Sequence, residues 1–302
     1  MGNVLCSILA HECCWRAAAW QSYGAAGIHV TANFVGTRVS AENPTDSDHN
    51  AIVFIFRAGE RSLLRILSWN VLCQYGYNEQ YGFPYDGFCR RSESNEAYLE
   101  RISRTAIEVA KLAAYSHVDV VLLQECAHVG EFGHDVLPKQ LELSLGPQGF
   151  TVLHEGEFLT AIRGDAAPAT VPLPKLRRQA EQIHAVHSTG LNSVFLNVHL
   201  LWDLRDSGEE RRSRSDIEAT IGHVSTKFPG AHIILAGDTN RVPADSMVDE
   251  EAATVEQLLG SLGLLCQPPG PTNVRWCGAE KGSELTYADF ALWVPACNSM
   301  PA

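Results

Sequence analysis

Short apolar runs separated by polar turns recur along most of the chain. The runs are rich in Val, Ile, Leu and Phe, a composition typical of strands that are buried on at least one face. The predicted strands span residues 28–34, 51–56, 64–70, 118–124, 150–154, 159–163, 193–200, 232–236 and 285–293. The second and third of these are joined by a short polar stretch around Gly59, which predicts a β-hairpin.

Other segments carry apolar residues at spacings of three and four, the period of an amphipathic helix. They predict helices over residues 99–113, 217–228 and 255–262. Strands that alternate with helices predict sheets covered by helices. No solenoid repeat and no Pro- or Ser-rich linker divides the chain, so we expect one domain over residues 25–302 and an N-terminal segment over residues 1–24.

The formal net charge of -12 argues against an electrostatic clamp for long nucleic acids, which needs clustered Lys and Arg. It does not exclude nucleic acid, because bound cations can offset several carboxylates locally. The 9 cysteines form no C-x-x-C pair and are odd in number, so their spacing indicates neither a structural zinc site nor a disulfide framework. We therefore expect an intracellular, cytoplasmic protein.

The first residues offer two readings. Gly2 followed by Cys6 resembles an N-myristoylation start with a palmitoylation site, although Ser7 stands one place later than the preferred Ser or Thr. The alternative is an unmodified N-terminal helix. His11 and Glu12 interrupt the mildly apolar stretch that follows, which argues against a signal peptide or a spanning helix. Association with a membrane through an acylated N-terminus stays open.

Chemistry-bearing residues gather at the ends of the predicted strands. Five short motifs each deliver an Asp, Glu, Asn or His from an apolar run. In chain order they are Ser47-Asp48-His49, Ser68-Trp69-Asn70, Leu123-Gln124-Glu125, Asn197-Val198-His199 and Gly237-Asp238-Thr239-Asn240, with a weaker sixth element at Tyr287-Ala288-Asp289-Phe290. Carboxylate oxygens suit a hard divalent cation, and histidines serve proton transfer and charge stabilisation. The set predicts a metal-assisted site for phosphoric esters.

Together these motifs resemble the endonuclease/exonuclease/phosphatase superfamily, which has the deoxyribonuclease-I-like fold. The resemblance implies an α+β fold, an α/β sandwich of four layers in which two packed mixed sheets are flanked by helices. It implies a hydrolase of phosphoric ester bonds that depends on Mg²⁺ or Mn²⁺.

The resemblance also assigns a role to each motif. Metal binding is implied for Glu125, Asp48 and Asn70, the last through a hydrogen bond to the metal-bound carboxylate. The implied catalytic residues are His49, His199, Asp238, Asn240 and Asp289. In this scheme Asp238 orients or deprotonates the attacking water, and Asp289 orients His49. Asn240 and His199 contact the phosphate.

The order of the motifs departs from the superfamily, in which the Ser-Asp-His element comes last. Here Ser47-Asp48-His49 comes first and runs through the predicted hairpin into Asn70. The interpretation we favour is a circular permutation with new chain ends in a surface loop, which is physically permissible. The alternative is that the tripeptide is a coincidence.

The substrate stays open at this stage. Aromatic residues after Asn70, from Tyr75 to Phe88, could stack on bases, so a nuclease or oligonucleotide phosphodiesterase is the first hypothesis. The acidic charge and the N-terminal Gly2 and Cys6 favour a membrane-associated phosphoinositide phosphatase or a sphingomyelinase-like phosphodiesterase. A third hypothesis, from another class, is a non-catalytic binding protein on the same scaffold. Oligomeric state is not indicated.

Overall fold

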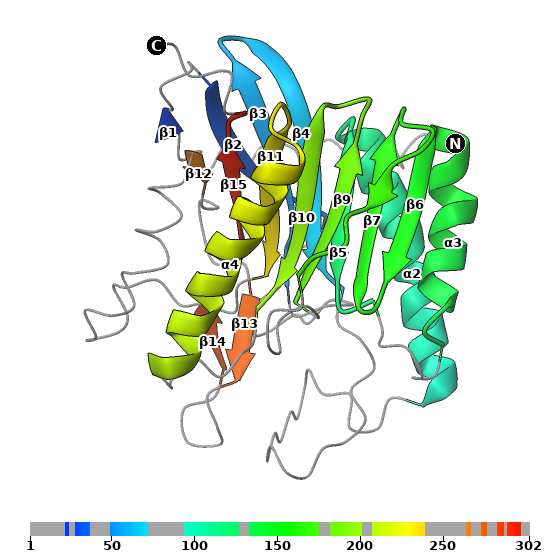
Figure 1. Ribbon diagram of the computed structural model, residues 1–302. Helices are drawn as coiled ribbons and strands as arrows, with labels where there is room; N and C mark the ends of the chain where they lie inside the picture. The colour runs from blue at the N-terminus through cyan, green and yellow to red at the C-terminus, as the bar shows by residue number, and fades with distance from the viewer. Residues whose placement is uncertain are drawn as a thin grey trace.

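The structure is a computed structural model that describes most of the sheet and helix framework. The described residues are 22–23, 28–36, 49–71, 94–126, 133–174, 182–200, 207–238, 264–266, 273–276, 283–286 and 289–296. Two packed mixed sheets form its centre (Figure 1). The expected fold class, an α+β sandwich of two mixed sheets flanked by helices, is confirmed.

The first sheet has seven strands in the order β1-β2-β3-β4-β5-β7-β6. Their bounds are β1 Ser22–Tyr23, β2 Ile28–Val35, β3 Ala51–Ala58, β4 Arg61–Asn70, β5 Val120–Gln124, β6 Phe150–Glu155 and β7 Phe158–Arg163. The pair β4–β5 is parallel and the other neighbours are antiparallel. The β3–β4 hairpin expected around Gly59 is confirmed. The start of β3 and the end of β4 therefore lie side by side at the edge opposite the turn.

The second sheet has six strands in the order β12-β15-β11-β10-β9-β8. Their bounds are β8 Ala169–Thr170, β9 Ile183–Ser188, β10 Ser193–His199, β11 His232–Asp238, β12 Leu264–Cys266 and β15 Asp289–Val294. Only β10–β11 is parallel among these pairs. A separate two-stranded sheet pairs β13 Asn273–Trp276 with β14 Ser283–Thr286.

The helices cover the outer faces of the two sheets (Figure 1). Helices α2 Asn95–Tyr115 and α3 Val136–Leu145 share one apolar cluster with the first sheet, and α4 Ser207–Lys227 shares another with the second sheet. A short 3₁₀ helix, η4 Gly146–Gln148, follows α3. Ser94 caps α2 by accepting a hydrogen bond from the backbone N–H of Ala97 at 3.2 Å. Among the described residues, no helix is both long and apolar enough to cross a membrane.

A third apolar cluster lies between the sheets and joins them. It contains Phe54 and Ile66 from the first sheet and Phe195, Ile234 and Trp293 from the second. Alternate residues of a strand share a face, so four more residues also face the gap between the sheets. Asn70, His199 and Asp238 each lie four positions after a member of this cluster, and Asp289 lies four positions before Trp293. The strands thus carry polar side chains directly from the apolar interior to the sheet edge.

The structure differs from the sequence expectations in some places, and other expectations fall outside the residues that it describes. The single strand predicted over residues 285–293 is wrong, because β14 and β15 belong to different sheets. The helix α3 and the strand β9 were not predicted. The helix expected over residues 255–262, and the N-terminal Gly2 and Cys6, lie outside the described residues.

Candidate active site

Three site residues lie in one row across the edge of the second sheet. His199, Asp238 and Asp289 are register partners on the neighbouring strands β10, β11 and β15. His199 and Asp238 lie two positions after Asn197 and Ala236, and Asp289 lies two positions before Ala291, all residues that face the gap between the sheets. Gly237 makes the row compact, since its φ is +146° and an added Cβ would lie 2.0 Å from the carbonyl oxygen of Val198.

Glu125 reaches the same gap from the first sheet by a change of backbone conformation. Strand β5 ends at Gln124, and Glu125 then adopts a left-handed φ of 55°. The next N–H, that of Cys126, donates to the carbonyl oxygen of Glu157 at 2.9 Å. Left-handed backbone costs free energy for a residue such as Glu, and residues held in it cluster at functional sites. The turn aims the buried Glu125 carboxylate at the second sheet.

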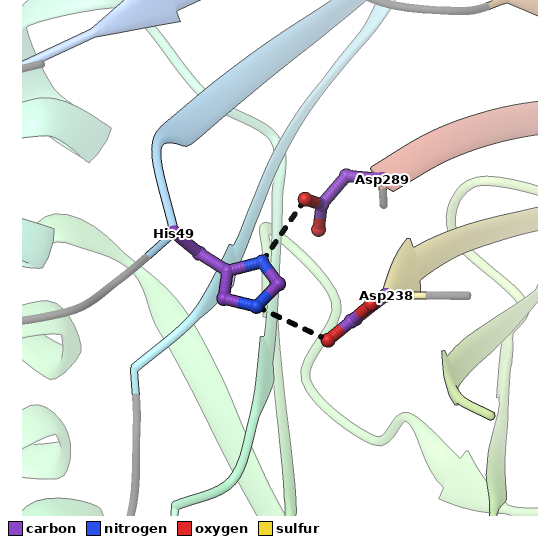
Figure 2. Close-up of side chains that lie close together, drawn as sticks. All are labelled: His49, Asp238 and Asp289. Carbon is purple, nitrogen blue, oxygen red and sulfur yellow. Dashed lines mark hydrogen bonds and ion pairs between the residues drawn. The ribbon is translucent and has the colours of Figure 1, made fainter. Parts of the chain in front are cut away.

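His49 lies between two carboxylates (Figure 2). Its Nδ1 is 3.1 Å from Oδ2 of Asp289, and its Nε2 is 3.4 Å from Oδ2 of Asp238. All three residues are buried. The indole N–H of Trp69 donates to the backbone carbonyl oxygen of His49 at 3.0 Å and so fixes the backbone that carries the ring. Residues near opposite ends of the chain thus form one hydrogen-bonded unit.

Asn70 links the two sheets at the site. Its Nδ2 donates to Oε1 of Glu125 and to Oδ2 of Asp238, each at 2.9 Å. One amide group therefore holds two carboxylates from different sheets. The contact with Glu125 is the one that the sequence resemblance implied for Asn70.

His199 makes a second set of contacts with carboxylates. Its Nδ1 lies 3.0 Å from Oε1 of Glu157, and its Nε2 lies 3.3 Å from Oε1 of Glu125 and 3.8 Å from Oδ2 of Asp238. Burial alone would lower the pKa of His199. The hydrogen bond that His199 donates to Glu157 and the charges of Glu157, Glu125 and Asp238 together outweigh burial and raise that pKa to about 10. At neutral pH the ring is an imidazolium that can donate to an anionic substrate.

Asp238 is the group shared by both sets of contacts. Burial raises its pKa above the ordinary value, the nearby His49 opposes this shift, and Asp289 adds to it. A carboxylate with a raised pKa binds a proton more readily than an ordinary one. Asp238 can therefore take up a proton at a pH at which an ordinary carboxylate stays ionised.

The side chains present fit a divalent cation. Four carboxylates, on Glu125, Glu157, Asp238 and Asp289, face two histidines, so the cluster carries excess negative charge when its acids are ionised. Two groups of possible metal ligands are present. One is His49, Asp238 and Asp289, and the other is Glu125, His199 and Asp238. Within each group the ligand atoms all lie within 4.8 Å of one another. Carboxylate oxygens are the ligands that Mg²⁺ and Mn²⁺ prefer.

Six of the eight residues named from the sequence come together in this way. They are His49, Asn70, Glu125, His199, Asp238 and Asp289. The other two, Asp48 and Asn240, lie outside the described residues. Sequence reasoning missed Glu157, which lies in the turn between β6 and β7. Its only sequence signal is an acid directly before an apolar strand, which is too common to be informative.

Comparison with known proteins gives matches only among solved structures. No family model and no curated protein matches the chain. D. rerio TDP2 complexed with a single-stranded DNA product is 18% identical, with a TM-score of 0.46, over 79% of this chain and 86% of that one. A variant of the 3′ phosphatase NExo from Neisseria, bound to a product DNA hairpin, is 17% identical, with a TM-score of 0.47, over 76% of this chain and 86% of that one.

An endonuclease/exonuclease/phosphatase from Bacteroides vulgatus is 14% identical, with a TM-score of 0.46, over 77% of this chain and 87% of that one. The name of this protein is that of the superfamily that the sequence motifs resemble.

Proposed function

We propose that this protein is a divalent-cation-dependent hydrolase of phosphoric diester bonds, built on the scaffold of the endonuclease/exonuclease/phosphatase superfamily. The observation that carries the proposal is the buried cluster in which Asn70 holds Glu125 and Asp238 together while His49 and His199 contact the same carboxylates. Burying several carboxylates side by side is costly unless cations compensate them. The burial of these carboxylates together supports a catalytic role for them.

Glu125 would hold the cation, together with the carboxylate of Asp48 that the resemblance implies. A cation bound there supplies a Lewis acid that polarises the phosphate and offsets its developing negative charge. Asn70 keeps the Glu125 carboxylate oriented through its hydrogen bond. His199, as an imidazolium, donates a hydrogen bond to an unbridged phosphate oxygen.

Asp238 accepts the proton of the attacking water. The water oxygen bonds to phosphorus, the bond to one ester oxygen breaks, and the leaving oxygen takes up a proton from solvent. Asp289 accepts a hydrogen bond from Nδ1–H of His49 and so orients the ring, with Nε2 facing Asp238. This pair lowers the free energy of the transition state by stabilising negative charge where it develops.

The test is hydrolysis of bis-p-nitrophenyl phosphate with Mg²⁺ or Mn²⁺ by wild type, Glu125→Ala and His49→Ala. A suitable control is Glu155→Ala, since the Glu155 carboxylate is 63% exposed and belongs to the same chain region as Glu157. We expect cation-dependent activity that falls at least about 100-fold in both site variants and is kept in the control. Activity that survives in both site variants would refute the assignment.

For the substrate we propose a nucleic acid or oligonucleotide. The support is the aromatic content of the segment that follows Asn70, which includes Tyr75, Tyr77 and Tyr81. Aromatic side chains stack on bases with little sequence preference. Cleavage of a fluorescent single-stranded oligonucleotide, compared with release of phosphate from phosphoinositide vesicles, tests this choice. Faster turnover of the vesicles would favour a membrane-directed phosphatase instead.

We also propose that the chain order is a circular permutation of the superfamily order. The β3–β4 hairpin supports this, because it links the strand that follows His49 to the strand that ends at Asn70 through a tight turn at Gly59. A chain reopened at Gly59, with its present ends joined by a flexible Gly/Ser linker, should fold and keep its activity. Reopening the β9–β10 turn at Gly190 is the matched control. A protein that folds only when opened at Gly190 would contradict the proposal.

A further inference from the structure

A layer of buried polar side chains lies between the sheets, directly beneath the site. Gln124 of β5 and Asn197 of β10 form its centre, and both side chains are fully buried. On the same strands, Leu122 and Phe195 belong to the apolar cluster on one side of the layer. On its other side Glu125 faces His199. The layer thus separates the apolar interior from the proposed catalytic groups.

The side-chain amide of Asn197 makes three hydrogen bonds, all to the opposite sheet. Its Nδ2 donates to the carbonyl oxygens of Leu123 at 3.0 Å and Leu159 at 3.1 Å, the last register pair of the β5–β7 ladder. Its Oδ1 accepts from Nε2 of Gln124 at 2.7 Å. Only the amide nitrogen can face two carbonyl oxygens, so the orientation of the side chain is fixed.

We infer that Asn197 is a positioning residue, which holds the two sheets at the separation and register in which Glu125 meets His199 and Asp238. An apolar side chain of similar volume could fill the space, so burial alone does not require an amide. Each bond of Asn197 ends one or two residues from a site residue: Leu123 and Gln124 precede Glu125, and Leu159 follows Glu157. Slippage between the sheets would separate carboxylate and imidazole that now lie 3.3 Å apart.

The inference rests on the proposed function, and its test combines catalysis with readouts that need no catalysis. The variant is Asn197→Leu, which keeps volume and removes all three bonds. The control is Ser188→Ala, which removes a buried 2.6 Å hydrogen bond to Asp165 at the opposite end of the second sheet. Gln124→Met, which removes the partner of Asn197 Oδ1, serves if the Asn197 variant does not fold.

In Asn197→Leu we expect kcat to fall about 30-fold, with a much smaller change in KM, because groups are misplaced rather than lost. The dissociation constant for Mn²⁺ should rise about tenfold. Hydrogen exchange of the Cys126 and Leu200 amides, which are bonded at the site end, should accelerate about tenfold relative to that of Gly164 at the far end. Ser188→Ala should lower stability without changing kcat or Mn²⁺ affinity.

A folded Asn197→Leu protein with wild-type kcat, Mn²⁺ affinity and exchange rates would overturn the inference. Exchange that accelerates equally at both ends would overturn it as well, because that is the signature of a purely structural role. A wild type that neither binds Mn²⁺ nor hydrolyses a phosphodiester would refute the proposed function. The exchange measurement would still decide whether Asn197 positions the site end of the sheets.

Discussion

The Nδ1 atom of His199 lies 3.0 Å from Oε1 of Glu157, a residue from the other sheet. This contact is the main reason why the pKa of His199 rises to about 10 in spite of its burial. Replacing Glu157 by Gln keeps the size of the side chain and removes its charge. We expect the pKa of His199 to fall in Glu157→Gln, and kcat to fall about tenfold to 100-fold. The pKa is measured by NMR titration of the imidazole in the cation-free protein.

The same contact predicts a dependence of stability on pH. The folded-state pKa of His199 lies above the value of about 6.5 expected for the unfolded chain. The stabilisation is therefore complete below about pH 6.5 and is lost as the pH rises towards 10. Wild type and Glu157→Gln should differ most in unfolding free energy at low pH and converge at high pH. A difference that grows with pH would contradict the assignment.

The backbone conformation of Glu125 should lower the stability of the fold, whereas its carboxylate is needed for activity. Its φ of 55° is unfavourable for every residue except glycine. Glu125→Gly and Glu125→Ala both remove the carboxylate and should both abolish activity, but Gly should be the more stable of the two by about 1 kcal/mol. Urea unfolding of the two variants measures the difference. Equal stability, or a more stable Ala variant, would show that the left-handed backbone is not retained.

Gly237 is required for the close approach of β10 and β11 at the site. A Cβ at this position would lie 2.0 Å from the carbonyl oxygen of Val198, so Gly237→Ala should destabilise the fold by about 3 kcal/mol or more. Gly222→Ala is the control, because Gly222 is in α4 and an added Cβ there meets nothing within 4 Å. The control should gain up to about 1 kcal/mol of stability. Thermal unfolding of both variants tests the pair.

The buried His184 should make the free energy of unfolding fall at low pH. Burial lowers the pKa of His184 to about 4, and the nearby His154 adds to the shift. The unfolded chain binds a proton near pH 6.5 that the folded protein rejects, so stability should fall by about 3 kcal/mol between pH 6.5 and pH 4. His184→Gln should remove this part of the pH dependence. An unchanged pH profile in the variant would show that another group is responsible.

The elements predicted well are those whose pattern is local. The β3–β4 hairpin follows from two apolar runs around Gly59, and α2 follows from a stripe at helical spacing. Strand β9, by contrast, has histidines at positions 184 and 187 that dilute its apolar pattern, and its burial depends on the opposite sheet. The boundary between β14 and β15 depends on long-range pairing partners, which a local pattern does not contain.

In the site, too, some residues could be predicted from local sequence and others depend on long-range contacts. Asn70, Asp238 and His199 end apolar strands, and the parallel pairs β4–β5 and β10–β11 bring such ends to one edge. Glu157 lies in the turn between β6 and β7 of the first sheet and reaches His199 of the second sheet only through the packing of the two sheets, so the residue could be recognised only in three dimensions. The left-handed turn at Glu125 is equally invisible in the sequence, since nothing at that position favours a positive φ.

The proposed activity of this cluster is the hydrolysis of phosphodiesters with the help of a divalent cation. The most direct measurement is the rate of bis-p-nitrophenyl phosphate hydrolysis as Mn²⁺ is titrated into chelator-treated wild type and Glu125→Gln. We expect a rate that rises from background and saturates in the wild type, and an affinity for Mn²⁺ at least about tenfold weaker in the variant. Hydrolysis that persists at full rate in chelator, or that responds to Mn²⁺ identically in both proteins, would contradict the account.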